Sequence, residues 1–276
     1  MIENVEVLGD LEENCQIANL PERNLGSTMF QHGTNVILCG GYGNFRDKCF
    51  SFGHYKWSYF NSFESYRSYS VGVSMKDALF TFGGNEVPST SQLLRFNSTI
   101  WQKGPKIPDG GVNGGCGVRI SDNTLLIIGG YRGMEDLTRI LKLNIDTGSW
   151  QDMYPFTMHQ PRVNHACIVF NGKVIITGGS NPITEIIEMH GNNLTIRYGG
   201  RLNDDRFGHG MGIVNYSGVP TLITFGGGLT VDSTEAESVE IWNDQDETWK
   251  VSTDIKMEIS RKLFGYATIP RELLCP

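Results

Sequence analysis

The stretch from Thr124 to Trp150, TLLIIGGYRGMEDLTRILKLNIDTGSW, decides the fold of this chain. A short apolar run ends on the diglycine Gly129–Gly130, and a polar loop separates it from a second apolar run that ends at Ile145. A turn, Asp-Thr-Gly, then leads to the tryptophan. Short apolar runs bounded by glycine and turn residues are typical of β-strands. The stretch therefore predicts a β-hairpin followed by a third strand that begins at Trp150.

The same unit recurs along the chain at intervals of 43, 46, 49 and 48 residues. The diglycines are Gly40–Gly41, Gly83–Gly84, Gly129–Gly130, Gly178–Gly179 and Gly226–Gly227. Tryptophan follows four of them, as Trp57, Trp101, Trp150 and Trp249. In the fourth repeat this slot falls on Ile196 or Arg197, and the sequence leaves both alignments open. A period of this length marks a repeat architecture, in which no repeat buries its apolar faces alone.

Both ends of the chain carry partial repeats. The segment Val5-Glu6-Val7-Leu8 reads like Val239-Glu240-Ile241-Trp242 of the last full repeat, which puts Cys15 in the tryptophan slot. Residues 261–276 read like the beginning of a repeat. We therefore predict that residues 1–20 supply the outer strands, and residues 261–276 the inner strands, of one split repeat. Five whole repeats and the split one make six, in a single domain that covers residues 1–276.

Composition limits the classes of function. The chain has 276 residues, a net charge of -7 and a pI of about 5.4, whereas binding to nucleic acid needs a basic face, so we expect no nucleic-acid partner. No run approaches the ~20 apolar residues of a membrane span. The first ten residues are acidic and strand-like, unlike a signal peptide. The expected location is extracellular if a leader has been removed, and cytoplasmic otherwise.

Gly-Gly, then an aromatic or large apolar residue, then Trp, with a period near 47 residues, resembles the kelch repeat. The resemblance covers essentially the whole chain and implies an all-β fold, a six-bladed β-propeller with one blade split between the termini. In such a fold the glycines and tryptophans are structural: glycine permits a close backbone approach, and the indole rings fill the wedges between blades. Kelch propellers serve mainly as interaction platforms, and a minority are enzymes. The resemblance thus implies a protein-interaction module that binds a protein or peptide through loops around its central channel.

The cysteines add a second resemblance. The spacing of Cys15, Cys39, Cys49 and Cys275 is similar to that in divergent kelch-only proteins of invertebrates, which are often secreted. Cys39 and Cys49 are expected at the two ends of one hairpin loop, close enough to bridge. The alternatives are a disulfide and two buried free thiols.

Three Asn-x-Ser/Thr triplets begin at Asn97, Asn193 and Asn215. Because asparagine is frequent in this chain, a few such triplets arise by chance, and the sequence alone gives them little weight.

The sequence offers no catalytic constellation. A metal site needs three or four converging ligands, and no HxH, HExxH or CxxC motif occurs. No GxSxG, P-loop or dinucleotide-binding unit occurs in a strand–helix context. We therefore expect no enzyme, no cofactor and no metal, with an enzyme or a binder of a sugar or acidic glycan at the channel mouth as the alternative. His165 and His209 occupy equivalent repeat positions, from which both are expected to approach the channel.

Five of the six repeats carry an arginine just before the first strand: Arg23, Arg67, Arg162, Arg206 and Arg261. In a closed ring these arginines recur at one height around the axis. One hypothesis is a basic ring at a channel mouth that binds an acidic peptide or glycan, because the guanidinium fork suits carboxylates. The alternative is that each arginine caps strand ends or pairs with a nearby acid.

Overall fold

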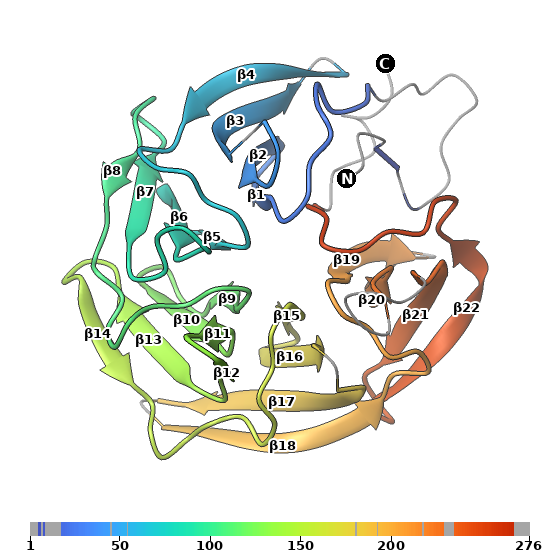
Figure 1. Ribbon diagram of the computed structural model, residues 1–276. Coiled ribbons are helices and arrows are strands. Elements are labelled where there is room, and N and C mark those ends of the chain that lie inside the picture. The colour runs from blue at the N-terminus through green and yellow to red at the C-terminus, as the bar shows by residue number, and fades with distance from the viewer. Residues whose placement is uncertain are drawn as a thin grey trace.

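The computed structural model describes residues 5, 6, 8, 18–44, 46–53, 55–179, 181–191, 193–216, 218–228 and 235–267. In this part of the chain, five four-stranded antiparallel sheets surround a central axis like the blades of a propeller (Figure 1). The prediction of an all-β propeller is confirmed. Within the described ranges, no helix is long and apolar enough to cross a membrane.

The blades follow the chain in order. Blade 1 consists of β1 (Thr28–His32), β2 (Asn35–Gly41), β3 (Arg46–Gly53) and β4 (Lys56–Ser62). Blade 2 consists of β5 (Val71–Ser74), β6 (Ala78–Phe82), β7 (Ser91–Arg95) and β8 (Gln102–Lys103). Blade 3 consists of β9 (Cys116–Arg119), β10 (Thr124–Ile128), β13 (Ile140–Asn144) and β14 (Ser149–Asp152). A small hairpin of β11 (Tyr131–Arg132) and β12 (Glu135–Asp136) interrupts blade 3.

Blade 4 consists of β15 (His165–Phe170), β16 (Lys173–Gly178), β17 (Ile183–His190) and β18 (Asn193–Arg201). Blade 5 consists of β19 (Gly210–Tyr216), β20 (Val219–Phe225), β21 (Ser238–Asn243) and β22 (Thr248–Lys256).

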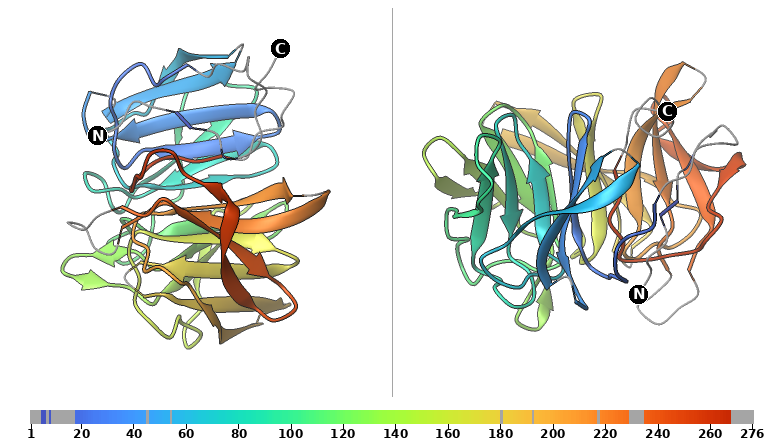
Figure 2. Two further views of the ribbon diagram at one scale, coloured as in Figure 1. Left: turned by 90° about the vertical axis from the view of Figure 1, so that its right-hand side faces the viewer. Right: turned by 90° about the horizontal axis from the view of Figure 1, so that it is seen from above.

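Strand direction gives the propeller two distinct faces, which Figure 2 shows from the side. The first strand of each blade lies at the axis, where β1, β5, β9, β15 and β19 follow one another. Because neighbouring strands are antiparallel, the turns between first and second strands and between third and fourth strands lie on one face. We call this the turn face. The turns between second and third strands, and the connections between blades, lie on the opposite face, which we call the loop face.

The hydrophobic core lies between adjacent blades. Every side chain of β6 and four of the five in β10 are buried, because a neighbouring sheet covers each face of these strands. Between blades 2 and 3, Phe80 and Phe82 of β6 pack with Leu125 and Ile127 of β10 in one cluster. The blades are therefore held by burial of apolar surface, about 25 cal/mol for each Å² removed from water.

The tryptophans connect neighbouring blades. Trp101 is buried, and its Nε1–H donates to Asn61 Oδ1 of blade 1 at 3.1 Å. Trp249 Nε1–H donates in the same way to Thr184 Oγ1 of blade 4 at 2.8 Å. In blade 4, Ile196 lies opposite Ile187 just as Trp249 lies opposite Trp242, so the open alignment resolves to Ile196.

The diglycines allow each blade to approach the next. The backbone N–H of the second glycine donates to a carbonyl oxygen of the following blade in all five cases, for example Gly84 to Val112 O at 3.1 Å and Gly130 to Arg162 O at 2.8 Å. A Cβ on Gly83 would collide with the Val112 carbonyl oxygen, and Gly83 has φ +65°. No other residue type fits this position without moving the neighbouring blade.

A buried Arg–Glu pair precedes the inner strand of blade 4. Arg162 and Glu185 are both fully buried, with Arg162 Nη2 3.1 Å from Glu185 Oε1. Arg162 Nη1 also donates to the carbonyl oxygen of Gly178 at 2.6 Å. The same carboxylate accepts hydrogen bonds from the backbone N–H groups of His159 and Gln160. We call this arrangement the arginine clamp, because it joins the inter-blade connection to the second and third strands.

The clamp recurs in blade 5. Arg206 Nη2 lies 3.0 Å from Glu240 Oε1, and Arg206 Nη1 donates to Gly226 O at 2.7 Å. The backbone N–H groups of Asn203 and Asp204 donate to the glutamate. A buried guanidinium needs such a partner, because an unpaired buried charge is strongly destabilising.

Blade 2 carries a version of the clamp in which glutamine replaces the glutamate. Arg67 Nη1 donates to Gly83 O at 2.7 Å, but Gln92 stands where the other blades have glutamate, and its Oε1 accepts the Glu64 N–H at 3.3 Å. Burial lowers the pKa of Arg67 to about 10, although the charges of Glu64 and Glu86 act in the opposite direction. Arg67 therefore remains charged at neutral pH.

Arg261 forms the clamp with a glutamate from the other end of the chain. Arg261 Nη2 lies 2.8 Å from Glu6 Oε2, and the backbone N–H groups of Glu258 and Ile259 donate to the same carboxylate. Glu6 thus takes the place that Glu240 takes in blade 5, as the match between the two sequence segments predicts. The rest of the predicted split blade, in residues 1–20 and 261–276, falls largely outside the described residues, so its strand pairing stays a prediction.

Two disulfides link described cysteines. Cys39 and Cys49 lie directly opposite each other on β2 and β3 and are bonded, so of the two alternatives the disulfide is confirmed. Cys116 of β9 and Cys167 of β15 form a second disulfide, which the sequence did not predict, between the inner strands of blades 3 and 4. The bridges span 10 and 51 residues, for which the chain-entropy model gives about 3 and about 4 kcal/mol. Cys15 and Cys275 lie outside the described residues.

We predict that Arg162→Ala lowers the free energy of unfolding by about 3–5 kcal/mol, because Glu185 would then be a buried carboxylate without its cation. The matched control is Arg201→Ala, which removes an exposed arginine from a surface pair with Asp205 and should cost about 0–1 kcal/mol. Urea unfolding measures both values. An equally small loss in the two variants would contradict the structural role of the clamp.

We further predict that Glu6→Ala destabilises the whole propeller by a similar amount, because it removes the carboxylate that joins the two ends of the chain at Arg261. Glu22→Ala, which removes a partly exposed glutamate 3.7 Å from Lys48, is the control. Thermal unfolding followed by circular dichroism compares the two. If Glu6→Ala melts at the temperature of the unmodified protein, the ends of the chain do not close the ring through this pair.

Candidate functional site

Six residues surround the channel mouth on the loop face, one from each repeat: Gly26, Tyr69, Gly114, Asn164, Gly208 and Leu263. Each backbone N–H donates to the carbonyl oxygen of the preceding member, and Gly26 donates to Leu263, so that six hydrogen bonds of 2.6–2.9 Å form a closed circle. All six residues have positive φ, between 50° and 65°. We call this circle the mouth ring. Its six members give the channel six sectors, of which five belong to the blades described above.

Glycine and larger residues alternate around the mouth ring for a steric reason. A Cβ on Gly114 would lie 2.7 Å from Asn164 Oδ1, and one on Gly208 would lie 2.6 Å from Leu263 Cδ2. Each glycine therefore makes room for the side chain that follows it. The ring holds three side chains and has no room for six.

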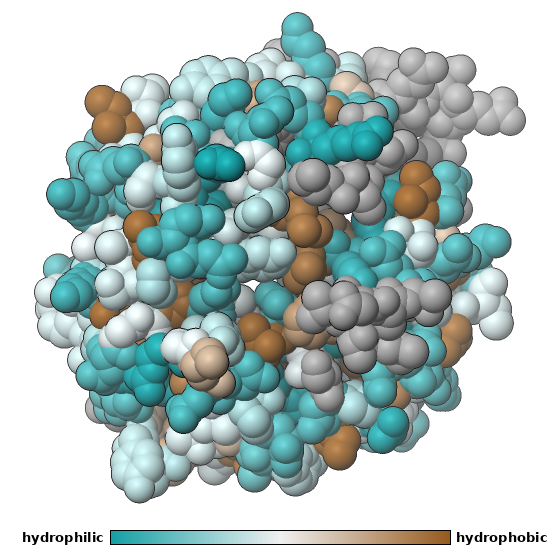
Figure 3. All heavy atoms as spheres, viewed as in Figure 1, coloured by the Kyte–Doolittle hydropathy of each residue, from teal (hydrophilic) through white to brown (hydrophobic). Residues whose placement is uncertain are grey.

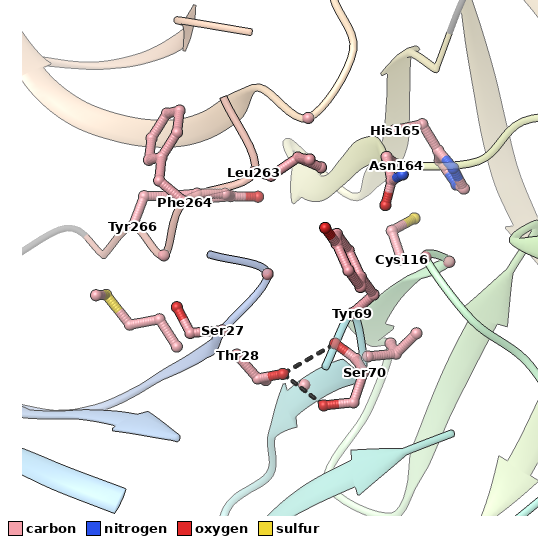
Figure 4. Close-up of a pocket in the computed structure, with 18 of the residues that line it drawn as sticks. Ser27, Thr28, Tyr69, Ser70, Cys116, Asn164, His165, Leu263, Phe264 and Tyr266 are labelled. Atoms are coloured by element: carbon pink, nitrogen blue, oxygen red, sulfur yellow. Dashed lines mark hydrogen bonds between the residues drawn. The ribbon is translucent and has the colours of Figure 1, made fainter. Parts of the chain in front are cut away.

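These three side chains form the entrance to the channel. Figure 4 shows Tyr69, Asn164 and Leu263 pointing toward one another across the mouth. The cavity they help to line has a volume of about 280 Å³. Its wall includes two hydroxyl groups that form a hydrogen bond with each other, Thr28 Oγ1 and Ser70 Oγ, 2.6 Å apart. The mouth is thus an aromatic, an amide and an aliphatic side chain above a wall that is partly polar.

An aromatic group extends the mouth outward between blades 1 and 2. Tyr42 and Tyr66 are 60% and 50% exposed, and the Arg46 guanidinium lies 5.5 Å from the centre of the Tyr66 ring. The Tyr42 backbone N–H donates to the carbonyl oxygen of Leu25 at 2.7 Å, which places Tyr42 beside Gly26 of the mouth ring. Burial raises the pKa of the Tyr69 phenol, and the neighbouring Tyr42 raises it further. We call Tyr42, Arg46, Tyr66 and Tyr69 the tyrosine cluster. Figure 3, which looks along the channel, shows a mainly hydrophilic face with hydrophobic side chains beside its centre.

The two repeat-equivalent histidines are among the residues that line the cavity. His165 and His209 are buried, and Figure 4 shows the His165 ring directed away from the cavity. Each ring packs on the first glycine of the preceding blade, and a Cβ on Gly129 would lie 2.8 Å from His165 Cε1. His209 Nε2 is 2.8 Å from Thr177 Oγ1. Both residues therefore lie at the channel, as the sequence predicts, but their rings pack on the diglycines, and the His165 ring does not point into the cavity.

The predicted partner-binding arginines do not form an accessible ring. Arg67, Arg162 and Arg206 are at most 1% exposed and Arg261 is 6% exposed, all engaged in the clamps. Arg23 is exposed, and Asn24 takes the clamp position instead, with its Nδ2 donating to Gly40 O at 2.8 Å. A partner on the surface would not touch the four buried guanidinium groups. The alternative reading, in which the arginines serve the repeat, fits their contacts.

Sequence reasoning missed the mouth ring. Its members lie two residues after the clamp position, and they share no residue type that would mark them, since three are glycine and three are not. The signal present in the sequence was the alternation itself, which becomes visible only when repeats are aligned on the clamp. No group of three or more potential metal ligands occurs among the residues that the structure describes.

Comparison with known proteins supports the fold and gives no information on function. No family model matches the chain, and no curated protein matches it. Among solved structures, one titled "Structure of YjhT" is similar with a TM-score of 0.70, at 14% sequence identity, over 89% of this chain and 87% of that one. At this identity the likeness shows a shared fold alone.

We predict that the buried histidines make the protein acid-labile. Burial, and next the charge of Arg162, lower the pKa of His165 to about 3, and burial followed by Arg206 lowers that of His209 well below its usual value. Each histidine is neutral in the folded state and takes up a proton on unfolding below pH 6.5, so stability is complete above that pH and falls as the pH drops toward the folded pKa. The slope is up to about 1.4 kcal/mol per pH unit for each histidine.

The measurement is the free energy of unfolding by urea at intervals between pH 7 and pH 5, above the range in which carboxylates titrate. His209→Gln should show a shallower slope than the unmodified protein, whereas the exposed His190→Gln should not. Parallel slopes for all three proteins would show that His209 is not the group that takes up the proton.

Proposed function

We propose that this chain is a protein-interaction module of the kelch type, which holds a protein partner on its loop face through the channel mouth and the tyrosine cluster. The observation that carries the proposal is the exposure of Tyr42 and Tyr66 beside the rim, with Arg46 over one of the rings. Tyrosine and arginine are the side chains most enriched where interfaces gain their binding energy.

Further exposed apolar side chains extend this surface around the loop face. Met134 in the β11–β12 hairpin is 91% exposed, and Tyr154 in the connection from blade 3 to blade 4 is 79% exposed. The hydrogen-bonded backbone of the mouth ring is a fixed scaffold, and the exposed side chains on either side of it lie on loops that this scaffold holds. The partner's charge is left open, because four of the five arginines that would have selected an acidic partner are buried.

The test compares three full-length proteins in affinity purification from the source organism: the unmodified chain, Tyr42→Ser/Tyr66→Ser, and Tyr59→Ser. Tyr59 is 62% exposed on β4, the outer strand of blade 1, and serves as the matched control. We expect a protein that the unmodified chain and the control retain, and that the double variant binds at least about tenfold more weakly, which corresponds to ~1.4 kcal/mol. Equal retention by all three would place the interface elsewhere.

A second candidate is a small-ligand binder, or an enzyme, that uses the channel. The cavity of about 280 Å³ and the hydroxyl groups of Thr28 and Ser70 on its wall favour a small polar molecule such as a sugar. A thermal-shift screen with monosaccharides, repeated on Tyr69→Ala, separates this candidate from the first. A shift that depends on Tyr69 and is unaffected by Tyr42→Ser/Tyr66→Ser would favour the channel.

A further inference from the structure

The three Asn-x-Ser/Thr triplets occupy one face of the molecule. Asn97 lies in the turn between β7 and β8, and Asn193 begins β18 just after the turn from β17. Asn215 lies at the end of β19, before the turn to β20. Turns between first and second strands and between third and fourth strands share the turn face, so the three asparagines belong to the face opposite the channel mouth ring. All three are exposed.

Two other observations on the described residues bear on these sites. The disulfides Cys39–Cys49 and Cys116–Cys167 are of the kind that persist in oxidising compartments, where asparagine-linked glycans are also added. Exposed apolar side chains accompany two of the three triplets on the same turns: Ile100 near Asn97, and Val219 near Asn215, at 70% and 60% exposure. A glycan on Asn97 or on Asn215 would cover apolar surface that water otherwise meets.

We propose that Asn97, Asn193 and Asn215 carry N-linked glycans, so that the turn face is a glycan-covered face. The donor is an oligosaccharide linked to a lipid diphosphate, and a transferase of the secretory pathway joins it to the acceptor. A bond forms between the asparagine Nδ2 and the anomeric carbon of the first sugar, while the bond from that carbon to the diphosphate oxygen breaks. The lipid diphosphate leaves with the bonding electron pair, and the amide nitrogen loses one proton.

Each triplet meets the chemical requirement for this transfer. The middle residues are Ser98, Leu194 and Tyr216, none of them proline, and the third residues are Thr99, Thr195 and Ser217. The inference does not depend on the partner-binding role of the loop face. The two are connected in one respect: glycans that cover the turn face would leave the loop face as the face without glycans, where a protein partner can bind.

The test is peptide mass spectrometry of the protein isolated from its natural source, with and without peptide N-glycosidase, which removes a glycan and converts its asparagine to aspartate. We expect conversion at Asn97, Asn193 and Asn215. Asn35, exposed at the turn between β1 and β2 on the same face but followed by Val36 and Ile37, is the internal control and should remain asparagine. Unmodified asparagine at all three triplets overturns the proposal.

A second measurement assigns the sites one at a time. The full chain is secreted from eukaryotic cells as the unmodified protein and as Asn97→Gln, Asn193→Gln and Asn215→Gln. Each variant should lose the mass of one glycan, and Thr99→Ala and Thr195→Ala should do the same while leaving the asparagine in place. A variant whose mass differs from that of the unmodified protein only by the substituted side chain removes that asparagine from the proposal.

Discussion

The rest of the structure depends on the closed circle of backbone hydrogen bonds around the channel mouth. Each bond joins neighbouring members of the ring, and in the five described blades the ring member comes just before the inner strand, so the start of each of these blades is set by its neighbours. Two residues earlier, the arginine clamp fastens the same segment to the second and third strands, with Arg162–Glu185 and Arg206–Glu240 as the fully buried cases. The diglycines permit the close contact that both require. In blades 4 and 5 the three devices act on one short segment of the chain.

Much of this architecture follows from the sequence, because its markers are residue types with few substitutes. Two markers recur visibly along the chain: glycine at the end of each second strand and tryptophan at the start of most fourth strands. Together they predicted a propeller. The similarity of the segments around Glu6 and Glu240 also identified an equivalence that the Arg261 contact now gives a physical meaning. What the sequence could not decide was the direction of a side chain. An arginine before a strand serves equally well as a surface ligand or as a buried clamp, and only its surroundings distinguish the two.

The same limitation applies to the candidate site. Cys116 and Cys167 are 51 residues apart in the chain, and nothing in their local sequence shows that two inner strands bring them together. Likewise, Asn24 replaces arginine in the clamp of blade 1, while Arg23 beside it is exposed. The search for a repeated arginine therefore selected Arg23, one residue before the residue that makes the clamp contact. Of the exposed tyrosines of the mouth, Tyr42 follows its diglycine as Tyr131 follows Gly129–Gly130, whereas Tyr66 has no tyrosine at the equivalent position of another repeat.

The alternation of glycine with larger residues in the mouth ring gives the entrance less symmetry than the propeller that carries it. Six sectors meet at the axis, yet only Tyr69, Asn164 and Leu263 project there, at every second position. The rim is thus three-sided, and its sides differ in polarity. A peptide or small molecule that enters along the axis meets the aromatic ring of Tyr69 on one side, the amide of Asn164 on the second and the aliphatic side chain of Leu263 on the third. The orientation of that molecule about the channel axis is therefore fixed by the rim before it contacts the outer loops.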